Sequence, residues 1–164
     1  MRSSIDSAEI ATAVAAMLCE QGSEVEKGFA AVTGDDVAGV LNFINSGSLP
    51  VARLIGTQKL LKGLSKESGK RFREHLKHYN AEYEAAPENS LYLSRFAIHK
   101  SYRGSGLAGI MMGRFLSLNQ ESGVTPHAFS LHVDQHNHRA IAFYSKYGFA
   151  PVNRKKRFVT MLKS

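Results

Sequence analysis

The order of apolar and polar residues along the chain predicts a mixture of helices and strands. Apolar residues spaced three or four apart predict helices that begin near Asp6, Pro50, Ser65, Leu107 and Asn137. Short runs of apolar and β-favouring residues predict strands over residues 29–32, 37–41, 91–98, 128–133, 149–152 and 158–162. The pattern therefore indicates a mixed α/β fold.

Capping residues and glycines indicate where these elements begin and end. Asp6 and Glu9 have the spacing of a capping box at the start of the first helix. Ser65 and Asn137 are expected to cap two later helices. The glycines expected to end helices are Gly22, Gly63, Gly123 and Gly148. The sequence Gly34-Asp35-Asp36 predicts a turn that joins the first two strands into a hairpin.

Length and composition narrow the class of protein. The 164 residues fall in the usual range for one domain, and 43% hydrophobic with 21% charged residues excludes disordered, collagen-like and coiled-coil chains. The one cysteine, Cys19, cannot form an internal disulfide, which favours a reducing compartment, and we expect the cytoplasm. No apolar run approaches the ~20 residues needed to cross a bilayer, so a membrane is not an expected partner.

The charge balance points to an anionic partner. Lysine and arginine total 21 against 14 acidic residues, which gives a formal net charge of +7. One basic run, residues 154–157, could contact nucleic-acid phosphates. Such a run is usually a solvated hairpin tip, and no aromatic platform accompanies it, so nucleic acid is not an expected partner.

The most informative segment is a small-residue turn, residues 103–108, between a predicted strand and a predicted helix. Glycines let the main chain approach a ligand closely, and the first turn of a helix leaves about four N–H groups free to donate to phosphate oxygens. Arg103 adds a positive charge. The turn therefore predicts a phosphate site, although a tight connection without a ligand is the alternative.

This turn resembles the acyl-CoA signature of the GNAT superfamily of N-acyltransferases. The residues that match the signature are Arg103, Gly106 and Ala108. A second motif is similar to that family downstream, and its residues are Leu131, His132, Val133, Asn137, Ala140, Ile141, Phe143, Tyr144, Lys146, Tyr147, Gly148 and Phe149. The resemblance covers residues 91–152. It implies a central mixed, mostly antiparallel sheet flanked by helices, in a single N-acetyltransferase domain over residues 1–164.

The same resemblance assigns roles to residues. The strand positions that would pair with pantetheine amides are Phe96, Ala97 and Ile98, through their main chain. The turn positions that would hold the pyrophosphate are Arg103, Gly104, Ser105, Gly106, Leu107 and Ala108. Asn137 would contact the pantetheine arm. Residues 91–152 would thus bind acyl-CoA, in a slot between the strands 91–98 and 128–133, and the helical segment 50–86 would line the acceptor side.

Acyl transfer to an amine also needs an acid, a base and an oxyanion donor. Tyr144 follows Asn137 by seven residues, about two helical turns, and a phenol can protonate the departing thiolate. It matches the family's general acid, although a half-buried core tyrosine is the alternative. No acid lies on strand 91–98, so His132 on the neighbouring strand is the candidate base, although a purely structural histidine is the alternative. A strand N–H near Ile98 is the candidate oxyanion donor.

The expected function is transfer of an acetyl group from acetyl-CoA to a primary amine by direct attack in a ternary complex. A small-molecule amine is the expected acceptor, a homodimer is compatible with the chain, and no metal is expected. Tyr79, Tyr83 and Tyr92 could line the acceptor pocket. The alternatives are a CoA-binding module without catalysis and a protein or peptide N-acetyltransferase.

Two other readings fit parts of the sequence. Gly104, Gly106 and Gly109 match a dinucleotide fingerprint, with Asp134 as its acid, but five polar residues separate the turn from its strand. A metal site would use the alternating residues His132, Asp134, His136 and His138. Asn137 is expected to start a helix there, which would break that alternation.

Overall fold

The structure is a computed structural model that describes residues 7–18, 20–25, 27–82, 84–121 and 128–164. The helices are α1 Ser7–Leu18, α2 Leu49–Lys62, α3 Lys66–Glu82, α4 Leu107–Glu121 and α5 His138–Lys146. The strands are β1 Gly28–Thr33, β2 Asp36–Asn45, β3 Ser90–Ile98, β4 Ala128–Asp134, β5 Ala150–Lys155 and β6 Phe158–Lys163. Short 3-10 turns precede two helices, η1 Ser46–Ser48 and η2 Lys100–Tyr102. Each predicted helix and strand is confirmed, with ends that differ by a few residues.

The six strands form one sheet in the order β1-β2-β3-β4-β6-β5. Neighbouring strands are antiparallel except for β3 and β4, which run parallel. A parallel pair needs a crossover connection, and α4 provides it between β3 and β4. The expected mixed, mostly antiparallel sheet flanked by helices is therefore confirmed.

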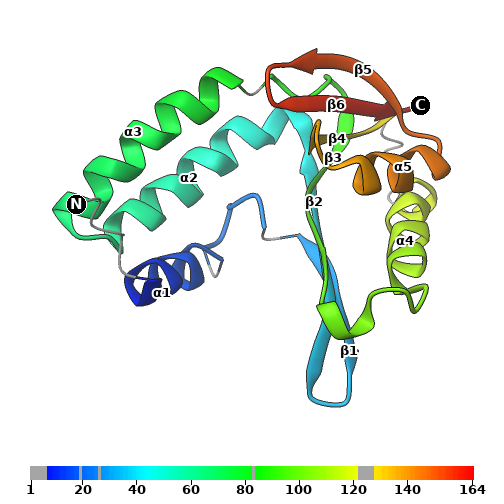
Figure 1. The fold of residues 1–164 in the computed structure, drawn as a ribbon, viewed down its shortest axis with the longest axis horizontal. Helices are drawn as coiled ribbons and strands as arrows, with labels where there is room; N and C mark the ends of the chain where they lie inside the picture. The colour runs from blue at the N-terminus through cyan, green and yellow to red at the C-terminus, as the bar shows by residue number, and fades with distance from the viewer. Residues whose placement is uncertain (1–6, 19, 26, 83, 122–127) are drawn as a thin grey trace.

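Helices lie on both faces of this sheet. In Figure 1, α4 and α5 lie on one side of the central strands and α1, α2 and α3 on the other. The main core lies between the sheet and the α4–α5 side, and its completely buried large side chains are Leu41, Met112, Phe115, Leu131 and Met161. Burial of this apolar face stabilises the central strands against the helices.

The observed turns and caps explain where elements end. The Oγ atom of Ser65 accepts a hydrogen bond from the N–H of Ser68 at 3.3 Å, so Ser65 begins α3 as predicted. Gly148, two residues after the end of α5, has φ +84°, a conformation that favours glycine and ends the helix. The first hairpin turn is tighter than expected, because β2 already begins at Asp36.

The carboxylate of Glu9 has a different role from the predicted capping box. Its Oε2 accepts a hydrogen bond from the Ser68 hydroxyl at 2.8 Å, and its Oε1 accepts one from the N–H of Ser65. These bonds hold the pKa of Glu9 below its ordinary value and tie α1 to the start of α3. The other half of the predicted box, Asp6, lies outside the described residues, as do Cys19 and Gly123.

Candidate active site

The two central strands separate after a short paired stretch. The last of three paired positions between β3 and β4 joins Tyr92 to Ser130. Beyond this point β4 stays paired with β6, while β3 stays paired with β2. The main-chain groups of β3 that face β4 are therefore left without a partner on β4, as a pantetheine-binding slot requires. This separation is the split expected from the sequence.

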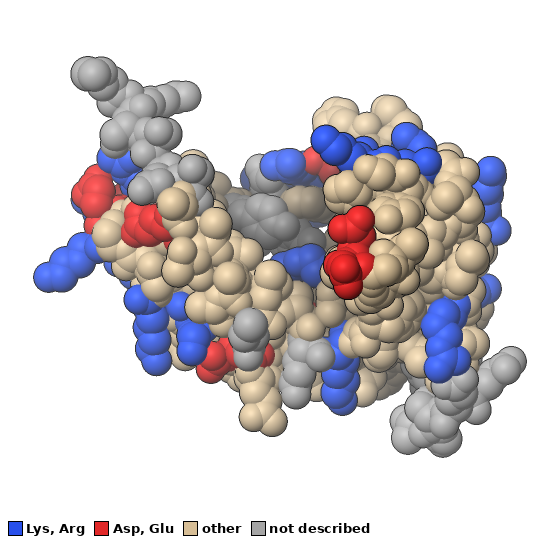
Figure 2. Space-filling model, turned by 90° about the horizontal axis from the view of Figure 1, so that it is seen from below, with Lys and Arg blue, Asp and Glu red and all other residues tan. Residues whose placement is uncertain are grey.

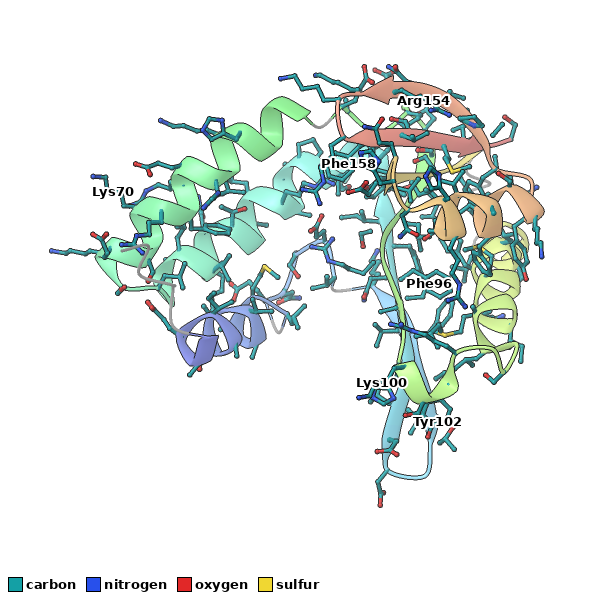
Figure 3. All side chains as sticks on the ribbon, viewed as in Figure 1. Lys70, Phe96, Lys100, Tyr102, Arg154 and Phe158 are labelled. Atoms are coloured by element: carbon teal, nitrogen blue, oxygen red, sulfur yellow. The ribbon has the colours of Figure 1, made fainter. Side chains whose placement is uncertain are left out.

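A β-bulge lies on β3 just after the strands separate. Asn42 pairs with Arg95 and Phe43 with Leu93, so Ser94 is an extra residue in the ladder. Leu93 before the bulge and Phe96 after it both pack against the α4–α5 core. Figure 3 shows Phe96 pointing toward that side. The bulge thereby leaves two consecutive residues, Ser94 and Arg95, between those core positions.

The predicted phosphate turn follows β3 after the short turn η2 and leads into α4. Gly104 has φ +85° and Gly106 has φ +84°, values that residues other than glycine rarely adopt. Apart from the adjoining residues, no atom lies within 4 Å of a Cβ placed on either glycine. Both residues are exposed. The Oγ atom of Ser105 donates to the carbonyl of Tyr102 at 2.7 Å, which fixes the turn. The main chain here is shaped by glycine and open to a ligand.

The first turn of α4 meets the end of β3 through Arg103. Its Nε donates to the carbonyl oxygen of Ile98 at 3.4 Å, which places the guanidinium between the strand and the turn. Leu107 opens the helix, and its N–H donates to the Oγ atom of Ser105 at 3.4 Å. N–H groups in a first helical turn have no partner within the helix itself. In Figure 3, Lys100 and Tyr102 project from the same end of the molecule. Positive charge and main-chain N–H groups of a helix start therefore meet at this turn.

Asn137 caps α5 and Tyr144 lies within it, and this helix packs beside the end of β3. The Oδ1 atom of Asn137 accepts a hydrogen bond from the N–H of Ala140 at 3.1 Å, which confirms Asn137 as the cap of α5. The ring of Phe143 lies 5.9 Å from that of Phe96, so α5 packs against β3 at the predicted pantetheine positions. The Tyr144 ring packs against Phe149, and burial raises the pKa of its phenol to about 12. Tyr144 therefore stays protonated at neutral pH.

His132 faces the opposite side of the sheet. Leu131 and Val133 belong to the core, and alternation along β4 places His132 between them on the α2 side. Its Nδ1 lies 3.1 Å from the Tyr92 hydroxyl, and its Nε2 is buried. Burial, and secondarily the positive charge of Arg53, lowers the pKa of His132 to about 4. The imidazole is therefore neutral at pH 7 and a weak base.

A charged cluster of Glu24, Arg53 and Arg95 lies beside this histidine and was not predicted from the sequence. Arg53 on α2 donates to the Tyr92 hydroxyl at 3.2 Å and to Glu24 Oε2 at 3.1 Å. Glu24 Oε1 also accepts from Arg95 at 2.5 Å. Glu24 lies on the connection between α1 and β1, 29 residues before Arg53, and no local motif links the two. The cluster connects the α1–α2 side of the molecule to the point where β3 and β4 separate.

A cavity of about 570 Å³ opens next to this cluster. Its apolar lining comes mainly from α1, α2 and α3, and consists of Met17, Val25, Leu54, Leu60, Phe72 and Leu76. Figure 2 shows the molecule hollowed between the part that holds these helices and the part that holds the sheet. Much of the lining lies in residues 50–86. Tyr92 does not line this cavity: its side chain is buried, and its hydroxyl bonds to Arg53 and His132. The side chains of Tyr79 and Tyr83 lie outside the described residues.

The residues of the two rival interpretations have other partners. The carboxylate of Asp134 accepts hydrogen bonds from Arg157 at 2.8 Å and from the N–H of His136 at 2.9 Å, which hold its pKa below the ordinary value. The helix that begins at His138 ends the alternation on which a metal site would depend. Within the described ranges, no three His, Cys, Asp or Glu residues form a metal-binding group. The basic run 154–157 spans the turn between β5 and β6.

Comparisons with known structures place this architecture among acetyltransferases. An N-acetyltransferase from Staphylococcus aureus Mu50 superposes with a TM-score of 0.71 at 17% identity, over 96% of this chain and 82% of that one. A second acetyltransferase structure superposes with a TM-score of 0.68 at 16% identity, over 97% of this chain and 82% of that one. The ribosomal-protein-S18-alanine N-acetyltransferase from Escherichia coli gives 0.51 at 12% identity, over 98% and 90%. At these identities the likeness establishes the fold.

The sequence itself establishes the family. Residues 14–149 match the acetyltransferase (GNAT) family, and the chain therefore belongs to it. Membership makes the protein an acyl-CoA-dependent transferase. No curated protein sequence matches the chain. Among the helices in the described part of the chain, none has the length and apolar character that a bilayer crossing requires.

Proposed function

We propose that the protein is an N-acetyltransferase that moves the acetyl group of acetyl-CoA to the primary amine of a small molecule. The observation that carries the proposal is the segment from β3 to α4, in which a strand edge that has separated from β4 is followed by the glycine turn and the start of a helix. A pantetheine arm needs main-chain hydrogen bonds, which the edge of β3 can supply. A pyrophosphate needs N–H donors and positive charge, which the turn and Arg103 can supply.

Residues of β3 and of the turn before α4 would bind different parts of acetyl-CoA. The main chain of Phe96, Ala97 and Ile98 would pair with the pantetheine amides, and the turn from Arg103 through Gly104, Ser105, Gly106, Leu107 and Ala108 would hold the pyrophosphate. The side-chain oxygen of Asn137 already accepts a hydrogen bond from the N–H of Ala140, so its Nδ2 atom would contact the pantetheine arm.

The acceptor would attack directly, in a ternary complex. The amine nitrogen forms a C–N bond at the thioester carbonyl, the C–S bond breaks, and the nitrogen gives up a proton while the sulfur gains one. Tyr144 would donate the proton to the thiolate. Burial raises the pKa of Tyr144, and the same desolvation would raise that of a thiol beside it, so the two groups remain comparable as acids.

His132 would accept the proton of the acceptor nitrogen, directly or through water. Its low pKa and its bond to Tyr92 make it a weak base, so most of the deprotonation would have to come from the surroundings of the amine. An apolar cavity and the charge of Arg53 both disfavour an ammonium ion. The oxyanion would be stabilised by a β3 N–H, near Ile98 or at the bulge of Ser94.

Residues 1–164 would form one N-acetyltransferase domain, with residues 50–86 on the acceptor side and residues 91–152 around acyl-CoA. We place the protein in the cytoplasm, as a monomer or homodimer, with no role for a metal.

The proposal is tested by thiol release from acetyl-CoA in the presence of a panel of amines, with mass spectrometry of the acetylated product. A non-catalytic module would bind acetyl-CoA and release no thiol with any acceptor. A protein or peptide N-acetyltransferase would release thiol with peptides that have a free α-amine and not with small amines. Either result would contradict the proposed reaction.

A further inference from the structure

The charges of the cavity beside β3 define the kind of acceptor it fits. Among its described lining residues, two carry a positive charge, Arg53 and Arg95, and one carries a negative charge, Glu24. The site therefore has one positive charge in excess. An acceptor with several ammonium groups would meet this excess with no second carboxylate to offset it.

The exposure of these three side chains strengthens the point. The Glu24 side chain is 13% exposed, against 34% for Arg53 and 47% for Arg95. The negative group is thus the more enclosed one, and the guanidinium groups are what the cavity presents to a ligand. In Figure 2, basic side chains are visible inside the hollow between the two parts of the molecule.

Arg95 keeps donors for a ligand. A guanidinium has five N–H donors, and within the described residues Arg95 uses two of its nitrogens, toward Glu24 and toward the Ser94 carbonyl. Ser23 also lines the cavity; it is buried, and its hydroxyl has no hydrogen-bond partner among the described residues. A carboxylate is the group whose flat pair of oxygens matches a guanidinium.

The position of the two arginines limits the distance between that carboxylate and the reacting amine. Arg95 directly follows the bulge on β3, and Arg53 binds the hydroxyl of Tyr92, at the last paired position of β3 and β4. Both therefore lie next to the opening of the acyl-CoA slot. An amine joined to its carboxylate through one carbon would reach the slot from there, with its side chain toward the apolar helical lining.

We propose that the acceptor is an α-amino acid with an apolar side chain, whose carboxylate binds Arg95 and Arg53. The inference rests on the proposed N-acetyltransferase function and names the substrate class of that same site. Glu24 orients the two guanidinium groups, and Ser23 supplies a further polar contact inside the cavity.

The test compares amines that differ only in the carboxylate. The pairs are leucine and leucinol, phenylalanine and phenylalaninol, and methionine and methioninol, with spermidine as a polycationic acceptor. Each amino acid and its alcohol have ammonium groups of nearly equal pKa, so their free-amine fractions match. We expect kcat/KM for thiol release to favour the amino acid by about tenfold or more in at least one pair, the effect of one charge-assisted contact.

Two variants give opposite signs. Arg95→Gln should bring the ratio of kcat/KM for the amino acid to kcat/KM for its alcohol closer to one, because it removes a cation. Glu24→Gln should increase this ratio, because it removes the anion. Both should leave the KM for acetyl-CoA unchanged. Lys70→Gln is the matched control, since Lys70 is exposed on α3 and points away from the cavity in Figure 3.

The outcomes separate this inference from the function on which it rests. Thiol release with amines but equal or lower rates for the amino acids would overturn the inference and leave the acetyltransferase function in place. Faster release with spermidine would do the same. Absence of thiol release with every amine would overturn both. A preference that Arg95→Gln leaves unchanged would assign recognition to other residues and overturn the role given to this cluster.

Discussion

The hydroxyl oxygen of Tyr92 lies 3.1 Å from Nδ1 of His132, at the position where β3 and β4 make their last pair. The same hydroxyl accepts a hydrogen bond from Arg53, so a group on α2 reaches the central strands through one tyrosine. This contact holds a buried imidazole beside a positive charge. Because both effects disfavour the imidazolium, His132 is neutral at physiological pH.

The pH dependence of the rate follows from that low pKa. If His132 accepts the acceptor's proton, the acidic limb of kcat, corrected for ionisation of the amine, should lie near pH 4 and not near 6.5. His132→Ala should flatten this limb. A limb near 6.5, or one that is unchanged in the variant, would show that another group takes the proton.

The pH dependence of stability has a defined sign. The pKa of His132 is lowered on folding from 6.5 to about 4, so between these values the unfolded chain binds the proton and the folded chain does not. The contribution of His132 to stability is present above pH 6.5 and decreases as the pH falls toward 4. Urea unfolding should show that the free energy of unfolding falls less between pH 7 and pH 5 in His132→Gln than in the natural protein. Equal decreases in the two proteins would contradict the burial of this group.

Removal of the Tyr144 hydroxyl should affect chemistry more than binding. Tyr144→Phe keeps the ring that packs against Phe149 and removes the proposed proton donor. We expect kcat to fall by about 10²-fold, the usual contribution of a general acid, with little change in the KM for acetyl-CoA. Tyr147→Phe, at the residue that directly follows this helix, is the control and should keep kcat. An undiminished rate in Tyr144→Phe would place the acid elsewhere.

Gly106 tests the shape of the phosphate turn. Gly106→Ala forces a side chain into φ +84°, which should cost about 1–2 kcal/mol and weaken acetyl-CoA binding. Gly113 lies within α4 and has open space around it. Gly113→Ala is therefore the control, and it should raise stability by roughly 0.5–1 kcal/mol without altering the affinity for acetyl-CoA. Thermal unfolding and acetyl-CoA titration measure both. Unchanged affinity in Gly106→Ala would argue against the turn as the pyrophosphate site.

Arg103 tests the charge of the same turn. Arg103→Glu should raise the KM for acetyl-CoA by about tenfold or more, because it places a negative charge beside the phosphates. Lys70→Glu makes the same change in net charge on the outer side of α3 and should leave that KM unchanged. Equal effects of the two variants would mean that overall charge, and not the turn, attracts the cofactor.

The features that were predictable from sequence are those that local geometry demands. A helix start needs a side-chain oxygen, and Asn137 supplies one to the N–H of Ala140; a turn with positive φ needs glycine, and Gly104 and Gly106 meet that need. The run of apolar and β-favouring residues over 128–133 likewise placed His132 on a strand. Each of these signals lies within a few residues of the structure it specifies.

The features that were missed depend on residues far apart in the chain. Glu24 and Arg53 are 29 residues apart, and Tyr92 and His132 are 40 apart, so neither pair leaves a local pattern. The bulge at Ser94 depends on the register against β2. Glu9 had the right spacing for a local cap, yet its carboxylate bonds to α3, because helix packing brings Ser68 within 2.8 Å.

A crystal structure with coenzyme A tests the central claim most directly. The account predicts the diphosphate against the N–H groups of residues 104–108 and the pantetheine arm between β3 and β4, paired with the main chain of residues 96–98. Coenzyme A bound elsewhere, or bound with this turn in contact with solvent alone, would contradict it.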